Sequence, residues 1–354
     1  MATKMRAVMK TESAPGLTWG QTDIPAVGPD EILVRVRAVS ICGTDLHIRR
    51  WDTWASHRVH PPLIVGHEMC GEVVDLGQRV TTVRAGDFIS AESHIVCGVC
   101  DQCRVGNGHI CENTRILGVD IDGVFAEYVR IPAANAWRNP PDMPWEIATL
   151  LENFGNAVHT ALAVDARGRR VLVTGCGPVG LMAIAVLRAV GARTIVATDI
   201  SAYRLALART MGADLALSPA RDDVAAAVSD ITEGHGADAL LEFSGAAPAI
   251  RQGFQLLRDG GEAALLGIPD RPIELDWAAD LVFKGVTVRG IVGRRLWDTW
   301  YSMRGLLHGG LVDLRPVVTH RFALSDFDQA MDTMQSGASG KVIMFPQGVP
   351  ELAG

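Results

Sequence analysis

The stretch VLVTGCGPVG, residues 171–180, decides the fold of the second half of this chain. Four strand-forming residues lead directly into Gly175, Gly177 and Gly180, and a helical pattern begins at Pro178. Glycines at this spacing between a strand and a helix are typical of a dinucleotide-binding turn, because they permit a tight turn and close approach of a pyrophosphate to the helix N-terminus. We therefore expect the following residues to contact a dinucleotide: Gly175, Gly177, Pro178, Val179 and Gly180.

Apolar strands alternate with helical segments on both sides of this stretch, from residue 170 to about residue 290. Near-continuously apolar strands are typical of a parallel sheet that is covered by helices on both faces. Six such strands predict an α/β fold with a doubly wound parallel sheet. The expected strands are 171–174, 194–199, 213–217, 238–245, 262–267 and 286–292.

The second of these strands ends at Asp199, about 20 residues after the glycines. A carboxylate in this place binds the adenosine ribose hydroxyls and repels a 2′-phosphate, so the sequence favours NAD over NADP. Arg204 lies close enough to keep NADP as an alternative. In a simpler interpretation the glycines only form a turn and Asp199 only caps the next helix. The order of strand, glycines, helix and acid favours the cofactor site.

The chain up to about Pro144 has a different pattern, with short β segments broken by Gly and Pro. Glu31–Ser40 alternates apolar and charged residues, as a half-buried strand does. Further strand candidates lie at 71–77 and 86–90. We expect an irregular, mostly β domain here, followed by a helical pattern at 145–164.

The tail from about Arg294 carries no pattern of an independent domain, so we expect it to return and complete the first one. The expected domains are therefore 1–155 with 295–354, and 156–294. In the tail we expect helices at 296–307 and 325–334, and strands at 316–320 and 340–345.

Four cysteines have the spacing C-x2-C-x2-C-x7-C in a loop rich in glycine and polar residues: Cys97, Cys100, Cys103 and Cys111. Four thiolates on one short loop can close a tetrahedron around Zn²⁺ and leave no open position, which describes a structural site. An iron–sulfur cluster is the alternative, because ferredoxins use similar spacings. The wide last gap and the lack of a proline after Cys111 favour zinc.

A second metal candidate is formed by Cys42, His67 and Glu68, which offer sulfur, nitrogen and oxygen. Three such ligands and an open position describe a catalytic zinc site. Thr44 and His47 follow Cys42 on the same short segment and are candidates for a proton relay. Taken singly, each is explained as a turn or surface residue. The combination with a nucleotide-binding half, which needs a group to activate an alcohol or carbonyl, favours the catalytic interpretation.

The composition is close to that of an average globular protein, with 48% hydrophobic and 21% charged residues among 354. No run of about 18 apolar residues is present, and the N-terminus does not have the pattern of a signal peptide. A formal net charge of −7 argues against nucleic-acid binding. We therefore expect a cytoplasmic protein with a small-molecule substrate and no membrane association.

Several stretches together resemble the zinc-containing medium-chain alcohol dehydrogenases, and the resemblance covers almost the entire chain. They are ICGTDLH (41–47), GHE (66–68), SAESHIVCG (90–98), FGNAVHTAL (154–162), GCGPVG (175–180), ALLGIP (264–269), GR (293–294), TWY (299–301) and GASGKVI (337–343). The resemblance implies a GroES-like catalytic domain with a zinc lobe at 94–114, a Rossmann domain that binds NAD, two zinc ions per subunit and a homotetramer.

The resemblance also implies roles for individual residues. Glu152 is an alternative to Glu68 as the carboxylate ligand of the catalytic zinc, although Asn153 follows it where the family commonly has proline. Thr44 and His47 are implied as the relay. Further cofactor contacts are implied at Leu266, Gly267, Ile268, Ile291 and Val292. The substrate pocket is expected to include His94, Trp51 and Arg294, with Trp54 near its mouth.

Within the family, the chain is most similar to the branch that oxidises the secondary hydroxyl of L-threonine. The implied product is 2-amino-3-oxobutanoate, with NADH. A polyol or aminocyclitol dehydrogenase is the nearest alternative, because the zinc, the relay and NAD would be the same. A non-catalytic NAD-binding redox sensor is disfavoured, since it would not need Cys42, Thr44, His47, His67 and an acid together.

Overall fold

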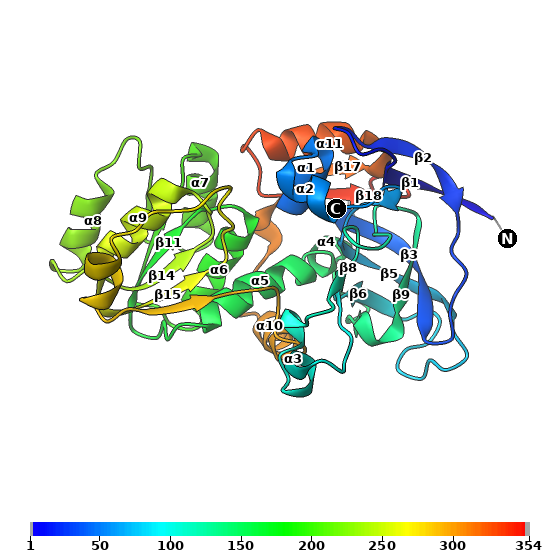
Figure 1. Ribbon diagram of the computed structural model, residues 1–354, viewed down its shortest axis with the longest axis horizontal. Coiled ribbons are helices and arrows are strands. Elements are labelled where there is room, and N and C mark those ends of the chain that lie inside the picture. Colours follow the sequence, from blue (N-terminus) through cyan, green and yellow to red (C-terminus); the bar gives the residue numbers. More distant parts are fainter. Residues whose placement is uncertain (1–2, 351–354) are drawn as a thin grey trace. The chain divides into compact units, whose positions relative to one another are not determined.

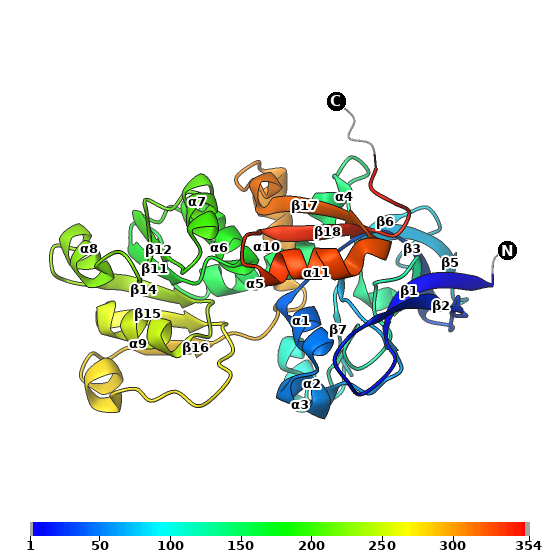
Figure 2. The same ribbon diagram turned by 90° about the horizontal axis from the view of Figure 1, so that it is seen from above.

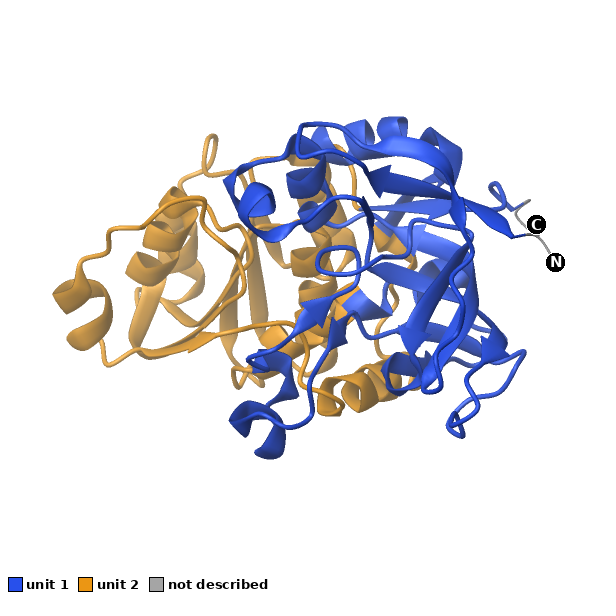
Figure 3. Cartoon of the chain, turned by 45° about the vertical axis from the view of Figure 1, so that its right-hand side comes forward, with its two compact units in different colours: residues 1–152, 318–336, 341–354 blue, residues 153–317, 337–340 orange. Residues whose placement is uncertain are grey.

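The computed structural model describes residues 3–350, which form two compact units (Figure 3). Unit 1 comprises the residues up to 152, 318–336 and those from 341 on, and unit 2 comprises 153–317 and 337–340. The tail thus contributes to unit 1. None of the helices formed by residues 3–350 is long and apolar enough to cross a membrane.

Unit 2 is built on one six-stranded sheet in the order β13-β12-β11-β14-β15-β16, and every pairing in it is parallel. This order is that of the doubly wound fold, so the predicted fold class is confirmed. The strands are β11 (Arg170–Thr174), β12 (Thr194–Thr198), β13 (Leu215–Leu217), β14 (Ala237–Glu242), β15 (Leu257–Leu265) and β16 (Thr287–Gly290).

Helices pack on this sheet because they are apolar where they meet it (Figure 1). α6 lies on β11 and β12 and buries an unbroken run of eight residues, 180–187. Leu172, Leu240 and Phe254 belong to the core between sheet and helices. The helices of unit 2 are α5 (Leu151–Leu162, which begins in unit 1), α6 (Pro178–Ala189), α7 (Ala202–Thr210), α8 (Val224–Ile231), α9 (Ala247–Leu256), α10 (Asp298–His308), the π-helix η3 (Trp277–Val282) and the 3₁₀ turn η4 (Arg315–Val317).

Residues 295–317 lie in unit 2, whereas the sequence had placed them in the first domain. The reason is packing: α10 buries Trp300 and Met303, and Met303 and Arg294 lie against Gly155 of α5. The expected strand at 316–320 begins only at Val318, because Pro316 cannot donate to a ladder and lies in a 3₁₀ turn. The helix expected at 145–164 is interrupted, because α4 covers only Trp145–Ala148 and α5 begins at Leu151.

Unit 1 is mostly β, as expected. Its main sheet has the order β10-β6-β5-β3-β18-β17, with β9 also paired to β3. The strands are β3 (Glu31–Ser40), β5 (Glu68–Leu76), β6 (Phe88–Ala91), β9 (Tyr128–Pro132), β10 (Ala136–Arg138), β17 (Val318–Ala323) and β18 (Lys341–Phe345). Smaller sheets are formed by β1 (Lys4–Lys10), β2 (Thr18–Asp23) and β4 (Leu63–Ile64), and by β7 (His94–Ile95) and β8 (Arg115–Ile116).

Short helices connect these strands, and α11 lies along β17 and β18 (Figure 2). The apolar positions of α11, Phe327, Ala330 and Met331, join the core of unit 1. The helices are α1 (Gly43–Arg50), α2 (Thr53–Arg58), α3 (Asp101–Arg104), α4 (Trp145–Ala148) and α11 (Phe327–Gln335), with 3₁₀ turns η1 (Gly108–Ile110), η2 (Ala133–Asn135) and η5 (Leu324–Asp326).

A buried ion pair ties the tail to the first strands of unit 1. The Lys341 ammonium on β18 donates to Glu68 Oε1 at 2.7 Å, and both side chains are at most 1% exposed. Lys341 also donates to the Ile41 carbonyl at 3.2 Å, and Ser40 on β3 donates to Glu68 Oε2. Three neighbouring strands are therefore held at one point.

We predict that Lys341→Met lowers the free energy of unfolding by about 3–5 kcal/mol, because it leaves the Glu68 carboxylate buried without its cation. Lys4→Met is the matched control, since the Lys4–Asp23 pair is exposed and its loss should not change stability measurably. Urea denaturation of both variants checks this. An equally mild effect of the two substitutions would contradict it.

Candidate active site and metal centres

The ends of β3 and β4 bring the proposed ligands of the catalytic metal together in unit 1. Cys42 follows β3 and caps the N-terminus of α1, and Glu68 is the first residue of β5, which pairs with β3. The intervening turn requires Gly66, whose φ is +88° and whose Cβ would lie 2.1 Å from Phe125 Cδ1. One ligand atom from each of Cys42, His67 and Glu68 lies within 4.8 Å of the others.

Negative groups surround the buried imidazole of His67. Its Nδ1 lies 3.7 Å from Asp45 Oδ1, and neither atom has a hydrogen-bond partner among residues 3–350. Burial lowers the pKa of His67, but Asp45, Cys42 and Glu152 outweigh burial and raise this pKa well above its ordinary value. Burial raises the pKa of Asp45 to about 6. A site that gathers sulfur, nitrogen and carboxylate oxygen around unsatisfied buried atoms fits a zinc ion.

The two candidate carboxylates have different partners. Glu68 is held by Lys341 and Ser40, as described above. Glu152, at the start of α5, accepts a hydrogen bond from Ser93 Oγ at 2.6 Å and is 4% exposed. Both therefore remain candidates for the oxygen ligand, Glu68 by its proximity to Cys42 and His67 and Glu152 by its action on the pKa of His67.

The relay candidates lie on α1, directly after Cys42. Thr44 Oγ1 is 3.9 Å from the Cys42 sulfur, so this hydroxyl is next to the metal site. His47 is three residues further along the helix, on the same face as Thr44. The His47 side chain is 53% exposed, and its Nδ1 hydrogen-bonds to Asp52 Oδ2. Thr44 thus lies next to the metal site and His47 reaches water, as the expected relay requires.

The expected pocket residues have distinct surroundings. His94 is half-buried, with its Nδ1 3.2 Å from Glu92 Oε1, and it directly follows Ser93, the partner of Glu152. Trp51 packs on the core of unit 1 with the Lys10 ammonium 4.7 Å from its ring centroid, and Trp54 is 44% exposed. Arg294 is fully buried in unit 2, where it donates to Asn156 Oδ1 at 3.1 Å.

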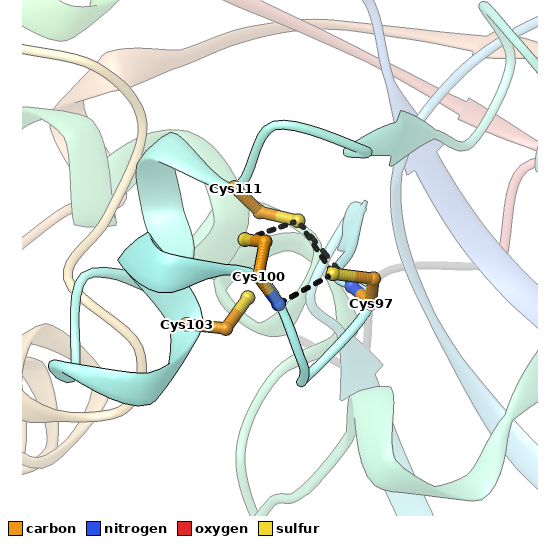
Figure 4. A group of neighbouring side chains, drawn as sticks. All are labelled: Cys97, Cys100, Cys103 and Cys111. Carbon is orange, nitrogen blue, oxygen red and sulfur yellow. Dashed lines mark hydrogen bonds between the residues drawn. The ribbon is translucent and has the colours of Figure 1, made fainter.

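The four cysteines of the expected structural site converge on one point in unit 1 (Figure 4). Cys97 and Cys111 sulfurs lie 3.5 Å apart, and those of Cys100 and Cys111 lie 3.8 Å apart. The N–H groups of Val99 and Cys100 donate to the Cys97 sulfur and lower the pKa of this thiol to about 6. Four sulfurs that converge on one point fit a tetrahedral zinc ion.

The glycine turn of unit 2, residues 175–180, has space for a ligand beside Gly177 and no space for a side chain at Gly180. A Cβ at Gly180 would lie 2.0 Å from the Gly175 carbonyl oxygen, so helix and turn pack too closely for any side chain. A Cβ at Gly177 would meet no atom within 4 Å. The open side, beside the start of α6, is where a pyrophosphate could approach the backbone.

Asp199 lies where the sequence placed it, at the end of β12. Its Oδ2 accepts from the Cys176 N–H at 2.7 Å and its Oδ1 from the Ser201 N–H at 2.8 Å, so the carboxylate also fixes the glycine turn. Arg204 is tied to the Ser339 carbonyl at 3.3 Å. Pro178 and Val179 are half-buried at the turn. These positions fit an NAD-type adenosine half.

The remaining cofactor candidates follow β15 and β16. Leu266 and Gly267 donate their N–H groups to the Glu242 carbonyl at 2.9 and 3.1 Å, whereas Ile268 is 89% exposed. Ile291 is buried and Val292 is half exposed. All five follow the carboxyl ends of the parallel strands, where ligands of such sheets bind.

Several site residues were not found from the sequence. Lys341 is 273 positions from Glu68, so no local pattern could connect them. Glu242 lies inside an apolar run, yet its carboxylate accepts from the N–H groups of Ser244 at 2.8 Å and Gly245 at 3.0 Å. Asp45 was detectable, because an acid three residues after an N-cap is a capping signal, and Cys42 N–H donates to it at 2.8 Å.

Two family profiles match the chain: an alcohol dehydrogenase GroES-like domain over residues 28–141, and a zinc-binding dehydrogenase domain over residues 178–308. The chain belongs to the zinc-binding dehydrogenase family. This confirms the predicted family and the GroES-like and Rossmann character of the two halves.

Similarity to individual members of the zinc-binding dehydrogenase family extends over the full chain. L-threonine 3-dehydrogenase of Symbiobacterium thermophilum is 51% identical over 98% of this chain and 99% of that protein. The enzyme of the same name from Caldanaerobacter subterraneus subsp. tengcongensis is 49% identical over 97% of this chain and 99% of that protein. The crystal structure of 2R,3R-butanediol dehydrogenase from Bacillus subtilis has a TM-score of 0.86 at 26% identity and covers 97% of this chain and 99% of that chain.

For this zinc-binding dehydrogenase, the glycine turn provides a matched pair of variants. Gly177→Ala should leave the free energy of unfolding unchanged, because the added methyl group meets no protein atom within 4 Å. It should raise the dissociation constant for NAD about tenfold or more, because the methyl group occupies the space where the pyrophosphate approaches the backbone. Gly180→Ala should destabilise the protein by about 2–4 kcal/mol through its clash with Gly175. Calorimetric titration and urea denaturation measure the two effects. Normal NAD binding by Gly177→Ala would place the pyrophosphate elsewhere.

Metal analysis of three Cys→Ser variants separates the two metal sites. Cys42→Ser and Cys100→Ser should each lower the zinc content from about two ions per chain to about one, and only Cys100→Ser should also lower the melting temperature markedly. Cys70→Ser is the control, because Cys70 is buried outside both ligand groups and should not change the zinc content. Unchanged zinc in Cys42→Ser would exclude Cys42 as a ligand.

Proposed function

We propose that this protein oxidises the secondary hydroxyl of L-threonine with NAD+, giving 2-amino-3-oxobutanoate, NADH and a proton. The observation that carries the proposal is the combination of two facts. The chain is 51% and 49% identical, along nearly its whole length, to two proteins named L-threonine 3-dehydrogenase. Its Cys42, His67 and Glu68 ligand group also has the Thr44 hydroxyl beside it.

The mechanism assigns each step to residues of unit 1. Cys42 and His67, with Glu68 or Glu152, would hold a zinc ion, which would supply a Lewis acid for the substrate hydroxyl, and bound NAD+ would supply the hydride acceptor. Thr44 receives the hydroxyl proton through its Oγ1 and passes its own proton on to His47. His47 releases the proton to water, because its imidazole is half exposed.

L-Threonine carries an ammonium and a carboxylate that a simple alcohol lacks, so the pocket needs partners for both. We propose that the substrate carboxylate binds beside His94. This residue follows Ser93, which donates a hydrogen bond to Glu152, and its imidazole is hydrogen-bonded to Glu92. Trp51, in the same unit as His94, is the second proposed pocket residue.

Two features of the working protein are inferred with the function. β16 is the edge strand of its sheet and all four of its residues are exposed, so we propose that it pairs with a second copy in a homotetramer. A cytoplasmic location suits seven cysteines that are free rather than disulfide-bonded.

A diol or polyol is the second candidate substrate. The similarity to the structure of a 2R,3R-butanediol dehydrogenase favours it, because the same metal site and relay would serve both alcohols. A redox sensor without catalysis remains the least supported alternative, since it has no use for the group of Cys42, Thr44 and His47.

NADH formation by the zinc-replete protein tests the substrate directly, with L-threonine, D-threonine, L-serine, 2,3-butanediol, sorbitol and an aminocyclitol. We expect L-threonine to have the highest kcat/KM by at least about tenfold, because the diol and polyol lack its ammonium and carboxylate, L-serine lacks its secondary hydroxyl and D-threonine has the opposite configuration. Cys42→Ser should abolish turnover and keep NAD binding. Activity on the diols or cyclitols alone would retain the zinc chemistry and overturn the threonine assignment.

A further inference from the structure

The two carboxylate oxygens of Asp52 have different hydrogen-bond partners. Its Oδ1 accepts the N–H of Ala55 at 3.0 Å and so caps α2, and its Oδ2 is hydrogen-bonded to His47 Nδ1. One oxygen therefore serves the helix and the other the imidazole. The pKa of Asp52 is lowered, because its hydrogen bonds from Ala55 and His47 outweigh the effect of burial.

A strained residue places Asp52 opposite His47. Trp51, the residue between α1 and Asp52, has φ +55° and ψ +46°, in the left-handed region that bulky residues avoid. This conformation reverses the chain at the end of α1, so that Asp52 returns to the side of a residue five positions earlier. A backbone conformation of this cost is kept where the surrounding structure holds it for a purpose.

The N-terminal strand supports the strained residue. The Lys10 ammonium on β1 lies 4.7 Å from the Trp51 ring centroid, a cation–π contact, and donates to the carbonyls of Ala14 and Gly16. Gly16 in turn donates its N–H to the Arg49 carbonyl of α1 at 2.8 Å. The turn that carries Asp52 is therefore fixed from two directions.

We propose that Asp52 is a positioning residue of the proton relay: by accepting the Nδ1–H of His47, it keeps Nε2 unprotonated and able to receive the proton that leaves through Thr44. This inference rests on the proposed alcohol oxidation. A neutral imidazole donates from one nitrogen and accepts at the other, so fixing the proton on Nδ1 determines the role of Nε2. When His47 takes up the proton, the Asp52 carboxylate also stabilises the imidazolium.

Because the two oxygens of Asp52 have different partners, Asp52→Asn and Asp52→Ser should affect His47 differently. In Asp52→Asn the single side-chain oxygen is needed by the Ala55 N–H, so the amide NH₂ group faces His47 and donates to Nδ1. The proton then moves to Nε2, which can no longer accept one. Asp52→Ser also caps α2, because serine is among the preferred N-cap residues, but its short side chain imposes no tautomer on His47. Both variants should fold as the unchanged protein does.

The test compares the unchanged protein with both variants by ¹⁵N NMR of His47 and by kinetics on whichever alcohol of the substrate panel the protein oxidises. We expect the Nδ1–H tautomer in the unchanged protein and Nε2–H in Asp52→Asn. The kcat should fall about 30-fold or more in Asp52→Asn and about threefold to tenfold in Asp52→Ser, with little change in KM. A concentrated basic buffer should restore part of the kcat of Asp52→Asn by replacing the relay.

Equal kcat in the two variants, or the same tautomer in all three proteins, would overturn the proposal and leave Asp52 as a helix cap only. If no alcohol on the panel is oxidised, the proposed function fails. The tautomer measurement then still decides whether Asp52 controls His47, because it needs no substrate.

Discussion

The buried pair of Glu68 and Lys341 is the constraint on which unit 1 depends. Its two charges come from the fifth and the last strands of the chain, and β3 runs between those strands. The pair fixes the start of β5, and the residue before it, His67, is a metal-ligand candidate. The same ammonium is bonded to the carbonyl of Ile41, the residue before Cys42. One cation thus positions the backbone on both sides of the proposed zinc site.

In unit 2, the loops that follow the parallel strands are positioned by close contacts between backbone segments rather than by ion pairs. Gly175, Gly245 and Gly267 lie where a Cβ would come within 2.7 Å of a neighbouring atom, and all three follow carboxyl ends of strands. Glu242 lies among them, with hydrogen bonds from the Ser244 and Gly245 N–H groups, and burial raises its pKa. The Glu242 carboxylate therefore holds the loop after β14, and the Glu242 backbone carbonyl accepts the N–H groups of Leu266 and Gly267 in the loop after β15.

The sequence predicted most of what depends on local patterns. Glu31–Ser40 was bounded correctly because apolar and charged residues alternate in its middle, and the turn before α6 because glycine spacing encodes it. Residues 295–317 were misplaced because α10 joins unit 2 through the long-range packing of Met303 and Arg294 against Gly155, which no window of sequence reveals. The sequence predicted the imidazole and thiol groups of the site but not the residues that orient them. Lys341 meets Glu68, and Asp52 meets His47, only because the folded chain brings them together.

Unit 2 is inserted into unit 1, and this order has a consequence for synthesis. The chain emerges from the ribosome with its N-terminus first, so Cys42, His67 and Glu68 are made long before Lys341, which follows Glu68 by 273 positions. Throughout that interval β3 lacks its neighbour β18, while all six strands of the unit 2 sheet are completed. Domains fold as units during synthesis, so the nucleotide-binding half can form while the metal-binding half still waits for its last strand. Cys42, His67 and Glu68 are thus accessible to chaperones and to competing metal ions until Lys341 and the rest of β18 have been made.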